Sequence, residues 1–335
     1  MKIIVDVMGG DSPCTTLAQG ALHAATAYGV EILLVGDEQA LEPVLKNAPA
    51  SVSVWNAPSF VTMEDDHYAV RTTKADSSMV QALRLLAEGK GDAVVSAGNT
   101  GALITAATLY VKRIRGVRRA ALAPILPTTT GTGALLIDCG ANVECTPEYL
   151  LQFGIIGHFY AQKLMHKEIP SVGLLNVGTE DTKGDSLRLA AFDLLKKADE
   201  QGILRFIGNI EGRDVLSGQV DVIVADGFSG NVLLKSIEGT ALFFLQEVKT
   251  ALLSSYRSKL GALLAKKSLS KLKEKMNYRK VGGSPLVGIA APVIKAHGSA
   301  DAETMQSAIA QAIAYAKGEI ISAIEQNIAA IKTTD

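Results

Sequence analysis

The stretch that decides the fold is DAVVSAGNTGALIT, residues 92–105. Its opening is a short apolar, partly β-branched run, which predicts a buried strand over Asp92–Ser96. Residues 97–101 are small, polar or Gly, a pattern typical of a turn that caps a helix, and we expect that helix to run through Arg113. A strand, a Gly-rich turn and a helix in direct succession form the repeating unit of an α/β protein.

The same unit recurs along the chain. Strands are also predicted at 2–7, 31–35, 51–55, 120–126, 133–138, 172–176, 203–207 and 220–225. Helices are predicted at 17–28, 78–88, 147–165 and 302–331. A further helix ends at about residue 198, and another begins near residue 230. Residues 127–132 read as a hairpin-like turn, and residues 281–296 as irregular to extended. The alternation predicts a three-layer αβα architecture around a mostly parallel, Rossmann-like sheet. No Pro-, Ser- or Gly-rich linker divides the chain, so we expect one domain over residues 1–335, either undivided or with two lobes.

Composition excludes several classes of protein. The 335 residues carry 33 basic and 34 acidic side chains, and 48% are hydrophobic, which argues against disorder. No apolar run reaches the length of about 20 residues that spans a bilayer, and Asp6 ends the first apolar run too early for a secretory signal. The three cysteines show neither disulfide nor zinc spacing. We therefore expect a cytoplasmic protein.

The near-neutral total charge hides one strongly basic segment. Residues Lys249–Lys280 contain ten basic side chains and one acid, Glu274, while the rest of the chain is acidic. Leucines at helical spacing predict two amphipathic helices with a turn near Lys266–Ser268, a basic helical insertion that protrudes from the domain. Such a segment suits an anionic membrane surface, an acidic protein or a dimer partner. Nucleic acid is disfavoured because few aromatic residues are available for stacking.

The candidate site lies where the strands end. In an open parallel sheet the loops after the strands share one edge, where Gly allows close backbone approach and helix N-termini favour an anion such as phosphate. The substrate-binding residues predicted on these loops are Gly9, Gly10, Asp11, Gly98, Asn99, Thr100, Gly101, Asn142, Asn176, Gly178, Thr179, Asn209 and Asp226.

Two further side chains on these loops are candidates for chemistry. Lys183 lies in a Gly-flanked loop before a helix, where its ammonium group could meet a phosphate. His297 lies between an extended segment and a helix start, and suits phosphate binding or acid–base work. The fingerprints of ATP- and dinucleotide-binding loops are absent, which disfavours both cofactors. Asp6, Asp138 and Asp226 lack the tight spacing of metal ligands, so neither a metal nor a cofactor is expected.

Seven motifs in a fixed order carry a resemblance to a known family. They are VDVMGGD at 5–11, SAGNTGA at 96–102, DCGAN at 138–142, LLNVGTE at 174–180 with Lys183 and Gly184, GNIEG at 208–212, DGFSGN at 226–231 and VIKAHGS at 293–299. Over essentially its whole length the chain resembles the bacterial phosphate acyltransferases of phospholipid synthesis, the PlsX family. Val7 and Cys139 depart from the family pattern, and the second departure argues against thiol catalysis.

The resemblance implies the reaction of acyl-[acyl carrier protein] with orthophosphate to give acyl phosphate and free carrier protein. It also implies a fold similar to phosphotransacetylases and isocitrate-dehydrogenase-like proteins, a homodimer, and peripheral association with the cytoplasmic membrane. The product would pass to a membrane-bound glycerol-phosphate acyltransferase for phosphatidic acid synthesis.

The predicted site suits that chemistry. Orthophosphate, with a second pKa of about 6–7, is largely a dianion near neutrality, and a thiolate leaves readily, so no catalytic triad or metal is required. We expect Lys183 and the amides of Gly98–Gly101 and Gly178–Thr179 to hold phosphate or the oxyanion. Asn231 is the third predicted catalytic residue beside Lys183 and His297, and His297 would protonate the leaving sulfur. Asn99, Asn142, Asn176, Asn209 and Asn231 would orient the reactants.

Other possibilities remain open at this point. Acidic carrier protein would dock on Lys249–Lys280 or on Arg113, Arg115, Arg118 and Arg119. Two rival functions are a nicotinamide-dependent dehydrogenase on a related fold and a non-catalytic adaptor for a membrane or for carrier protein. Phosphate-dependent release of free thiol separates an enzyme from an adaptor.

Overall fold

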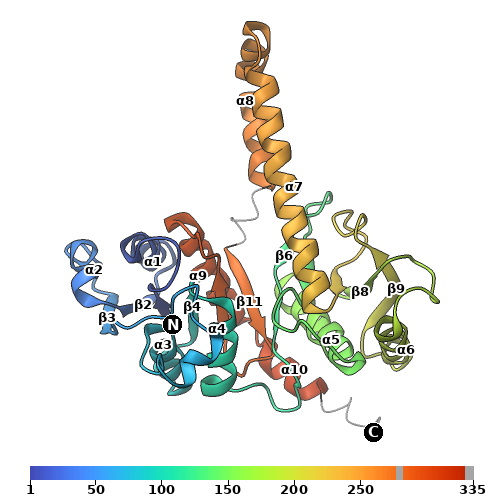
Figure 1. Cartoon of the computed structure of the whole chain (residues 1–335), viewed down its shortest axis with the longest axis horizontal. Coiled ribbons are helices and arrows are strands. Elements are labelled where there is room, and N and C mark those ends of the chain that lie inside the picture. The colour runs from blue at the N-terminus through green and yellow to red at the C-terminus, as the bar shows by residue number, and fades with distance from the viewer. Residues whose placement is uncertain (277–281, 329–335) are drawn as a thin grey trace.

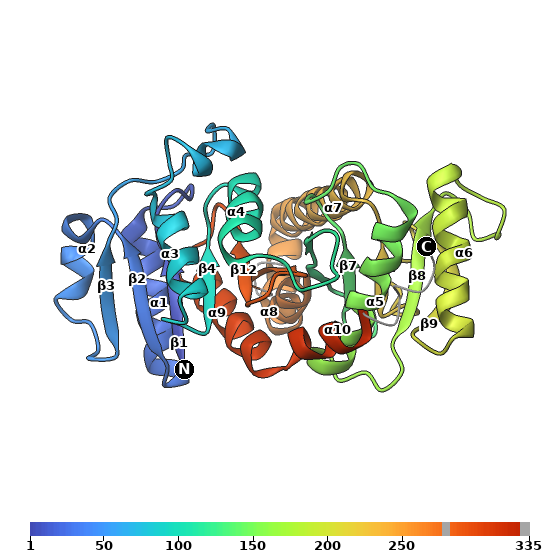
Figure 2. The same ribbon diagram turned by 90° about the horizontal axis from the view of Figure 1, so that it is seen from below.

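The computed structural model describes residues 1–276 and 282–328, and it contains two β-sheets flanked by helices (Figures 1 and 2). The seven-stranded sheet has the order β3-β2-β1-β4-β12-β11-β5. Its strands are β1 (Lys2–Asp6), β2 (Glu31–Gly36), β3 (Val52–Asn56), β4 (Ala93–Ser96), β5 (Ala121–Leu122), β11 (Gly283–Val287) and β12 (Val293–Ala296).

The five-stranded sheet has the order β6-β7-β10-β8-β9. Its strands are β6 (Ile125–Leu126), β7 (Ala134–Ile137), β8 (Ser171–Asn176), β9 (Arg205–Glu211) and β10 (Val222–Val224). In both sheets most neighbouring strands pair in parallel, and the antiparallel pairs among the described strands are β11 with β12, β11 with β5 and β6 with β7. The prediction of a mostly parallel α/β architecture is confirmed.

The helices cover both sheets (Figure 2). They are α1 (Cys14–Tyr28), α2 (Glu38–Leu45), α3 (Ser78–Ala87), α4 (Thr100–Ala106), α5 (Pro147–Leu164), α6 (Ser186–Glu200), α7 (Gly227–Leu253), α8 (Tyr256–Met276), α9 (Ala302–Lys317) and α10 (Ile320–Ile328). A 3-10 helix, η1 (His67–Arg71), precedes α3, and a π-helical turn, η2 (Ala107–Val111), extends α4.

The single sheet predicted from the sequence is wrong, because the chain changes sheet inside the run predicted as one strand, 120–126. β5 pairs with β11 in the first sheet, whereas β6 pairs with β7 in the second. Pro124 lies between β5 and β6, and a proline has no N–H for a β-ladder. The predicted hairpin around 127–132 is therefore confirmed only for its β6–β7 part.

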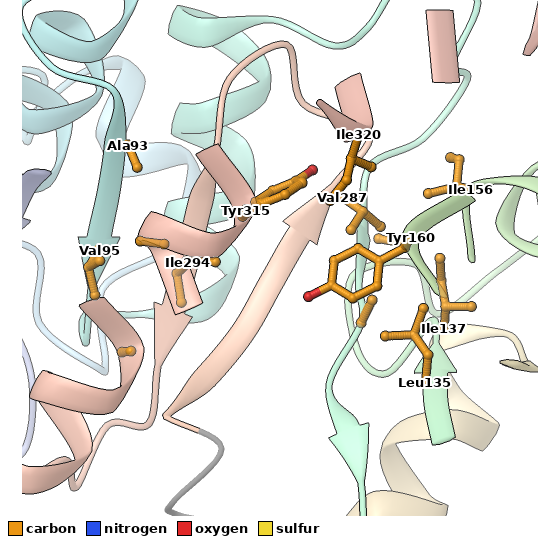
Figure 3. Close-up of a cluster of buried hydrophobic side chains, with 14 of the residues drawn as sticks. Ala93, Val95, Leu135, Ile137, Ile156, Tyr160, Val287, Ile294, Tyr315 and Ile320 are labelled. Carbon is orange, nitrogen blue, oxygen red and sulfur yellow. The ribbon is translucent and has the colours of Figure 1, made fainter. Parts of the chain in front are cut away.

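A hydrophobic core joins the two sheets through the C-terminal helices. α9 packs on β12 and β4, and α10 packs on α5. Tyr315 of α9 and Tyr160 of α5 are both buried, with ring centroids 6.0 Å apart, between side chains of the first sheet and of the second (Figure 3). That the chain folds as one domain over residues 1–335 stays a prediction.

Several element boundaries differ from the predicted ones. The helix predicted at 302–331 divides at Gly318 and Glu319, where Glu319 has a positive φ of 51°, and its predicted end at 329–331 lies outside the described residues. β9 continues to Glu211, so the predicted loop at 208–212 is mostly strand. In the segment predicted as irregular to extended, 281–296, the extended parts are β11 and β12, with residues 288–292 between them. The sequence patterns missed α2 and η1.

Helices α7 and α8 extend away from the body of the molecule (Figure 1) and contact each other. The turn between them lies at 254–255, so the prediction of a turn near Lys266–Ser268 is wrong: α8 runs through that region. None of the helices in the described part of the chain is long and apolar enough to cross a membrane. The end of the basic segment, including Tyr278, Arg279 and Lys280, lies outside the described residues.

Candidate active site

A cleft of about 1140 Å³ is lined by residues of both sheets and of α7. Four of the residues predicted from the sequence line it: Asp11, Thr100, Asn231 and His297. Lys235 and Lys295 add two cations to its wall, and much of the remaining lining is apolar. The cleft therefore combines charged groups with an apolar surface, as sites for amphipathic ligands do.

The first edge of the cleft consists of the loops that follow β1, β4 and β12. The backbone N–H of Asp11 donates to the carbonyl of Gly298 at 2.9 Å, which ties the first loop to the last. Gly9 has a positive φ of 71°, and a Cβ there would lie 2.4 Å from the Val61 carbonyl oxygen. Gly10 is also close, since a Cβ would lie 3.3 Å from the Gly298 carbonyl oxygen. Glycine is thus required at position 9 for the loops to meet.

Asn99 organises a further loop at this edge. Its amide nitrogen lies 3.2–3.3 Å from the carbonyl oxygens of Thr62, Met63 and Asp65, and its Oδ1 accepts from the N–H of Ala102 at 3.1 Å. The side chain of Asn99 is thereby the N-cap of α4 and an anchor for residues 62–65. Its bonds position the protein itself, and a role toward reactants stays a prediction.

Lys295 is the buried cation of the first edge. It lies near the end of β12, its side chain is 8% exposed, and its Nζ donates to the carbonyl oxygens of Ala97 and Ala296. Burial lowers the pKa of Lys295 to about 8, and nearby Asp11 and Asp6 oppose that change. Asp6 is fully buried, which raises its pKa to about 6, although Ser96 Oγ donates to it at 2.6 Å.

His297 follows β12 and lines the cleft half-buried. Its Nδ1 lies 2.9 Å from Ser299 Oγ and 3.3 Å from the backbone N–H of Ser299. Because a backbone N–H can only donate, Nδ1 acts as the acceptor, and the proton of the neutral ring is on Nε2. In that tautomer Nε2–H is a hydrogen-bond donor, whereas acid catalysis requires the imidazolium, whose Nδ1–H can donate to Ser299 Oγ.

The second edge of the cleft is built on a buried carboxylate. Asp138 accepts from the backbone N–H groups of Leu122 at 2.9 Å, Cys139 at 2.7 Å and Asn142 at 2.7 Å. Burial raises the pKa of Asp138, and these bonds work against that shift. Asn142 donates its side-chain amide to Asp138 at 3.0 Å, and its carbonyl accepts from the N–H of Gly227 at 2.8 Å. Asn142 therefore positions the start of α7.

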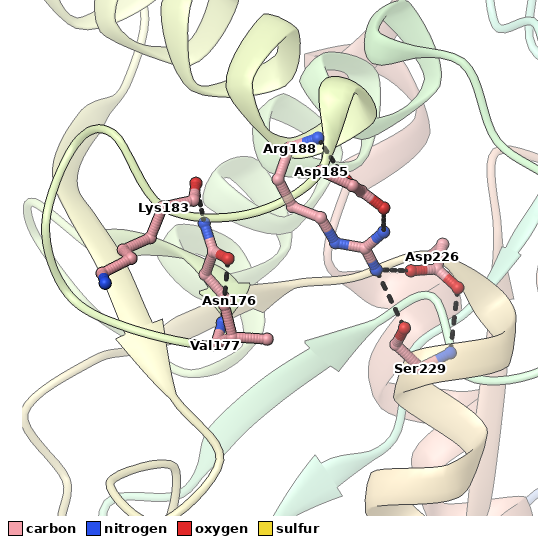
Figure 4. A network of polar contacts seen from close by, with 7 residues as sticks. All are labelled: Asn176, Val177, Lys183, Asp185, Arg188, Asp226 and Ser229. Atoms are coloured by element: carbon pink, nitrogen blue, oxygen red, sulfur yellow. Dashed lines mark hydrogen bonds and ion pairs between the residues drawn. The ribbon is translucent and has the colours of Figure 1, made fainter.

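Asp226 caps the N-terminus of α7 and forms an ion pair (Figure 4). It accepts from the N–H of Ser229 at 2.9 Å, and the Arg188 guanidinium binds its other oxygen. The same guanidinium donates to Ser229 Oγ at 2.8 Å and pairs with Asp185 at 2.8 Å. Asp226 thus fixes α7, which carries Asn231, against α6.

The remaining predicted residues lie outside the cleft lining, at the end of β8, in the loop that follows it and, for Asn209, on β9. Asn176 donates to the carbonyl of Lys183 at 3.0 Å and accepts from the N–H of Val177 (Figure 4). Lys183 and Thr179 are exposed, and Gly178 lies beside the stem of Lys183. Asn209 donates to the carbonyl of Glu180 at 2.9 Å. The structure brings these residues together at the edge of the second sheet but not to the cleft, and their roles stay predictions.

The structure gives no support to thiol catalysis by Cys139. Cys139 is buried beside Asp138, and both the burial and the carboxylate raise the pKa of its thiol, so it is a poor nucleophile. No group of three or more His, Cys, Asp or Glu within residues 1–276 and 282–328 is arranged to hold a metal ion.

Lys295 is the residue that the motif-based prediction missed. Lys295 belongs to the motif at 293–299, whereas the position of Lys183 in a loop made Lys183 the predicted cation. The available signal was a lysine inside the apolar run Pro-Val-Ile-Lys-Ala, residues 292–296. A lysine is almost never fully buried without a paired or functional role.

The architecture is that of the phosphotransacetylases. A phosphotransacetylase from Streptococcus pyogenes superposes with a TM-score of 0.63 at 16% identity, covering 94% of both chains. A 4-hydroxythreonine-4-phosphate dehydrogenase from Klebsiella pneumoniae gives a TM-score of 0.57 at 14% identity, covering 94% of this chain and 99% of that one. At these identities the likeness concerns the fold alone.

The sequence relatives define the family. Residues 1–323 match the family described as "Fatty acid synthesis protein". A phosphate acyltransferase from Bacillus pumilus is 45% identical over 98% of both chains, and one from Listeria innocua is 42% identical over 99% of this chain and 98% of its own. The chain belongs to this family of phosphate acyltransferases, which confirms the resemblance found in its motifs.

Proposed function

We propose that the chain transfers an acyl group from acyl-[acyl carrier protein] to orthophosphate. The observation that carries the proposal is the composition of the cleft, which sets Lys295 and His297 in one cavity with an apolar wall that includes Leu126, Leu234 and Ile237. Charged groups suit the phosphate, and the apolar wall suits a fatty acyl chain. The phosphate acyltransferase relatives support the same reaction class.

The reaction needs little beyond placement and charge stabilisation. An oxygen of dianionic phosphate attacks the thioester carbonyl carbon, the carbon–sulfur bond breaks, and the thiolate takes up a proton. Holding the two reactants together supplies about 7–11 kcal/mol of the barrier reduction. His297 is the proposed proton donor, and Asn231 and Lys183 are the proposed groups for orienting the reactants and stabilising the oxyanion. His297 and Asn231 line the cleft, whereas Lys183 is exposed and lies outside the cleft lining.

Free thiol release tests the activity directly. Purified protein is incubated with acyl carrier protein charged with a fatty acyl group, with phosphate, with sulfate or with neither. Thiol should appear only with phosphate, together with the phosphorus NMR signal of an acyl phosphate. Release without phosphate would identify a thioesterase, and no release would favour an adaptor.

Lys183→Ala should lower the rate of thiol release about 100-fold if Lys183 stabilises the oxyanion. The exposed Lys197→Ala is its control, and a normal rate for Lys183→Ala removes that assignment.

The remaining partners are proposals that the surface supports. The basic helix α8 would receive acidic carrier protein or an anionic membrane surface, or pair α7 and α8 with a second copy in a homodimer. On α8, Leu260, Leu263 and Leu264 are 62%, 66% and 82% exposed beside lysines. Apolar residues flanked by basic ones suit the surface of an anionic bilayer. The acyl phosphate would then pass to a membrane-bound glycerol-phosphate acyltransferase in phospholipid synthesis.

Sedimentation with vesicles separates these partners. The wild type should pellet with vesicles that contain anionic lipid and not with neutral ones. The double variant Leu260→Glu/Leu264→Glu should stay in solution, whereas Ile169→Glu, which changes a 67% exposed residue on the body, should pellet normally. Equal binding by all three would assign α7 and α8 to the dimer or to carrier protein.

A further inference from the structure

Lys295 carries its ammonium group in a buried position of the first sheet. It lies on β12 between β4 and β11, paired in register with Ser96 and Ser284, and it is 8% exposed while still lining the cleft. A buried ammonium group is costly unless it is bonded or binds an anion. The function of Lys295 therefore depends on what its three N–H groups meet.

Two of these N–H groups meet main-chain carbonyls. Nζ donates to the carbonyl of Ala97, 3.3 Å away in the loop after β4, and to that of Ala296 at the end of its own strand. An ammonium group has three donors and no acceptor, so one N–H remains beyond these two bonds. Since the side chain borders the cleft, that donor is placed to serve a ligand there.

The carboxylates near Lys295 favour its protonated form, but their own hydrogen bonds are made largely with other groups. Asp6 lies on β1 and Asp11 on the following loop, and both favour the charged form, whereas Lys235 on α7 opposes it. Asp6 is already bonded to Ser96 Oγ and to the N–H of Met8. The paired strands β4 and β11 contribute no ionisable group, and on α9 Glu303 is exposed.

We propose that Lys295 is the cation that anchors orthophosphate in the cleft, with its third N–H donated to a phosphate oxygen. The assignment rests on the proposed function and names the subsite for its inorganic substrate. Two other lysines are less suited: Lys183 is exposed outside the cleft lining, and Lys235 is 55% exposed and paired with Glu238 at 2.7 Å. A phosphate held by Lys295 lies beside His297, two residues further along the chain.

Phosphate binding measured by calorimetry tests the proposal without requiring turnover. Lys295→Met keeps most of the side-chain length and removes the charge, so the dissociation constant for phosphate should rise about 10- to 100-fold, the effect of one charge-assisted hydrogen bond. Lys196→Met makes the same change on the exposed face of α6 and should bind phosphate as the wild type does. Equal affinity in all three proteins would overturn the assignment.

The pH dependence of the wild type covers the case in which Lys295→Met fails to fold. Phosphate is already a dianion at pH 8, and the free ammonium of Lys295 loses its proton from about pH 8 upward. Phosphate affinity should therefore fall about tenfold for each pH unit above 8. An anchoring lysine in open solvent would keep its charge to about pH 10. Constant affinity between pH 8 and 9.5 would contradict the proposal.

Kinetics distinguish failure of this assignment from failure of the proposed function. In the thiol-release assay Lys295→Met should raise the KM for phosphate and leave the KM for acyl carrier protein unchanged. If the wild type turns over and the variant keeps its phosphate KM, Lys295 is not the anchor and the function stands. If the wild type binds phosphate through Lys295 but releases no thiol, the subsite stands and the acyl transfer does not.

Discussion

The two edges of the cleft are built by opposite means. At the first edge, backbone loops approach closely at Gly9 and Gly10, and the charges of Lys295 and Asp6 lie buried behind them. At the second edge, the carboxylates of Asp138 and Asp226 are bonded to several N–H groups. Both carboxylates of the second edge hold protein groups, so that edge mainly fixes geometry. The first edge holds the ionisable groups, Lys295 and Asp6, whose charge a bound ligand can stabilise or change.

A methyl group added at the tightest backbone contact of the second edge should have the largest effect on stability. A Cβ at Gly230 in the first turn of α7 would lie 1.9 Å from the carbonyl oxygen of Asp138. Backbone cannot move aside as a side chain can, so Gly230→Ala should destabilise the protein by at least about 3 kcal/mol. Equilibrium urea unfolding measures the loss.

Two other glycines calibrate that result. Gly239→Ala changes the same helix where nothing lies within 4 Å, and it should stabilise the protein slightly. Gly98→Ala, at the first edge, would meet the flexible end of Met79 at 2.6 Å and should cost less than Gly230→Ala. If Gly230→Ala costs no more than Gly98→Ala, the backbone contact between Gly230 and Asp138 is not the tighter of these two constraints.

The ionisable first edge should be visible in the pH dependence of stability. Burial raises the pKa of Asp6 to about 6, whereas an unfolded aspartate titrates near 4. Between these values the native state binds more protons than the unfolded state, so ionisation of Asp6 lowers stability as pH rises from about 4 to 6. Asp6→Asn removes that penalty, and its stability relative to wild type should rise by up to about 3 kcal/mol across this window.

Parallel unfolding curves at pH 4, 5, 6 and 7 provide the measurement. The exposed Asp193→Asn is the matched control and should show a difference from wild type that does not change with pH. A flat difference for Asp6→Asn as well would mean that Asp6 is ionised in the fold without penalty.

The contrast between the edges also explains what the sequence could predict. Strands such as β1 and β4 and their Gly-rich loops follow from local patterns, and those loops do meet at the cleft. The switch between sheets at Pro124 does not follow from local sequence patterns, because a two-residue strand such as β5 is defined only by its distant partner β11. Lys295 was missed for the same reason: its burial depends on β4 and β11, which flank it in the folded sheet.

The next largest effect concerns the proton donor at the first edge. If His297 protonates the leaving sulfur, His297→Ala should lower the thiol-release rate about 100-fold. The loss should shrink with an acyl thioester of a more acidic thiol, because such a leaving group needs less assistance. His23→Ala, an exposed histidine on α1, is the control. A loss that is independent of the leaving thiol would make His297 a binding residue instead of an acid.

The smallest effect is expected from the ion pair of the second edge. The side chains of Arg188 and Asp226 are 16% and 7% exposed, and Arg188 also bonds Ser229. Removing one partner from a buried pair leaves the other charge uncompensated, and the partial exposure of Arg188 reduces that penalty, so Arg188→Met should cost about 2 kcal/mol in urea unfolding. The exposed pair of Lys90 with Glu88 gives the matched control.

Lys90→Met should cost less than about 1 kcal/mol, because exposed pairs contribute little. Arg188→Met should also raise the KM for acyl carrier protein more than that for phosphate, since α7 carries Asn231 and part of the apolar wall, whereas the phosphate subsite lies at the first edge. An equal change in both KM values would mean that the two edges act as one unit, and the division of labour between them would have to be given up.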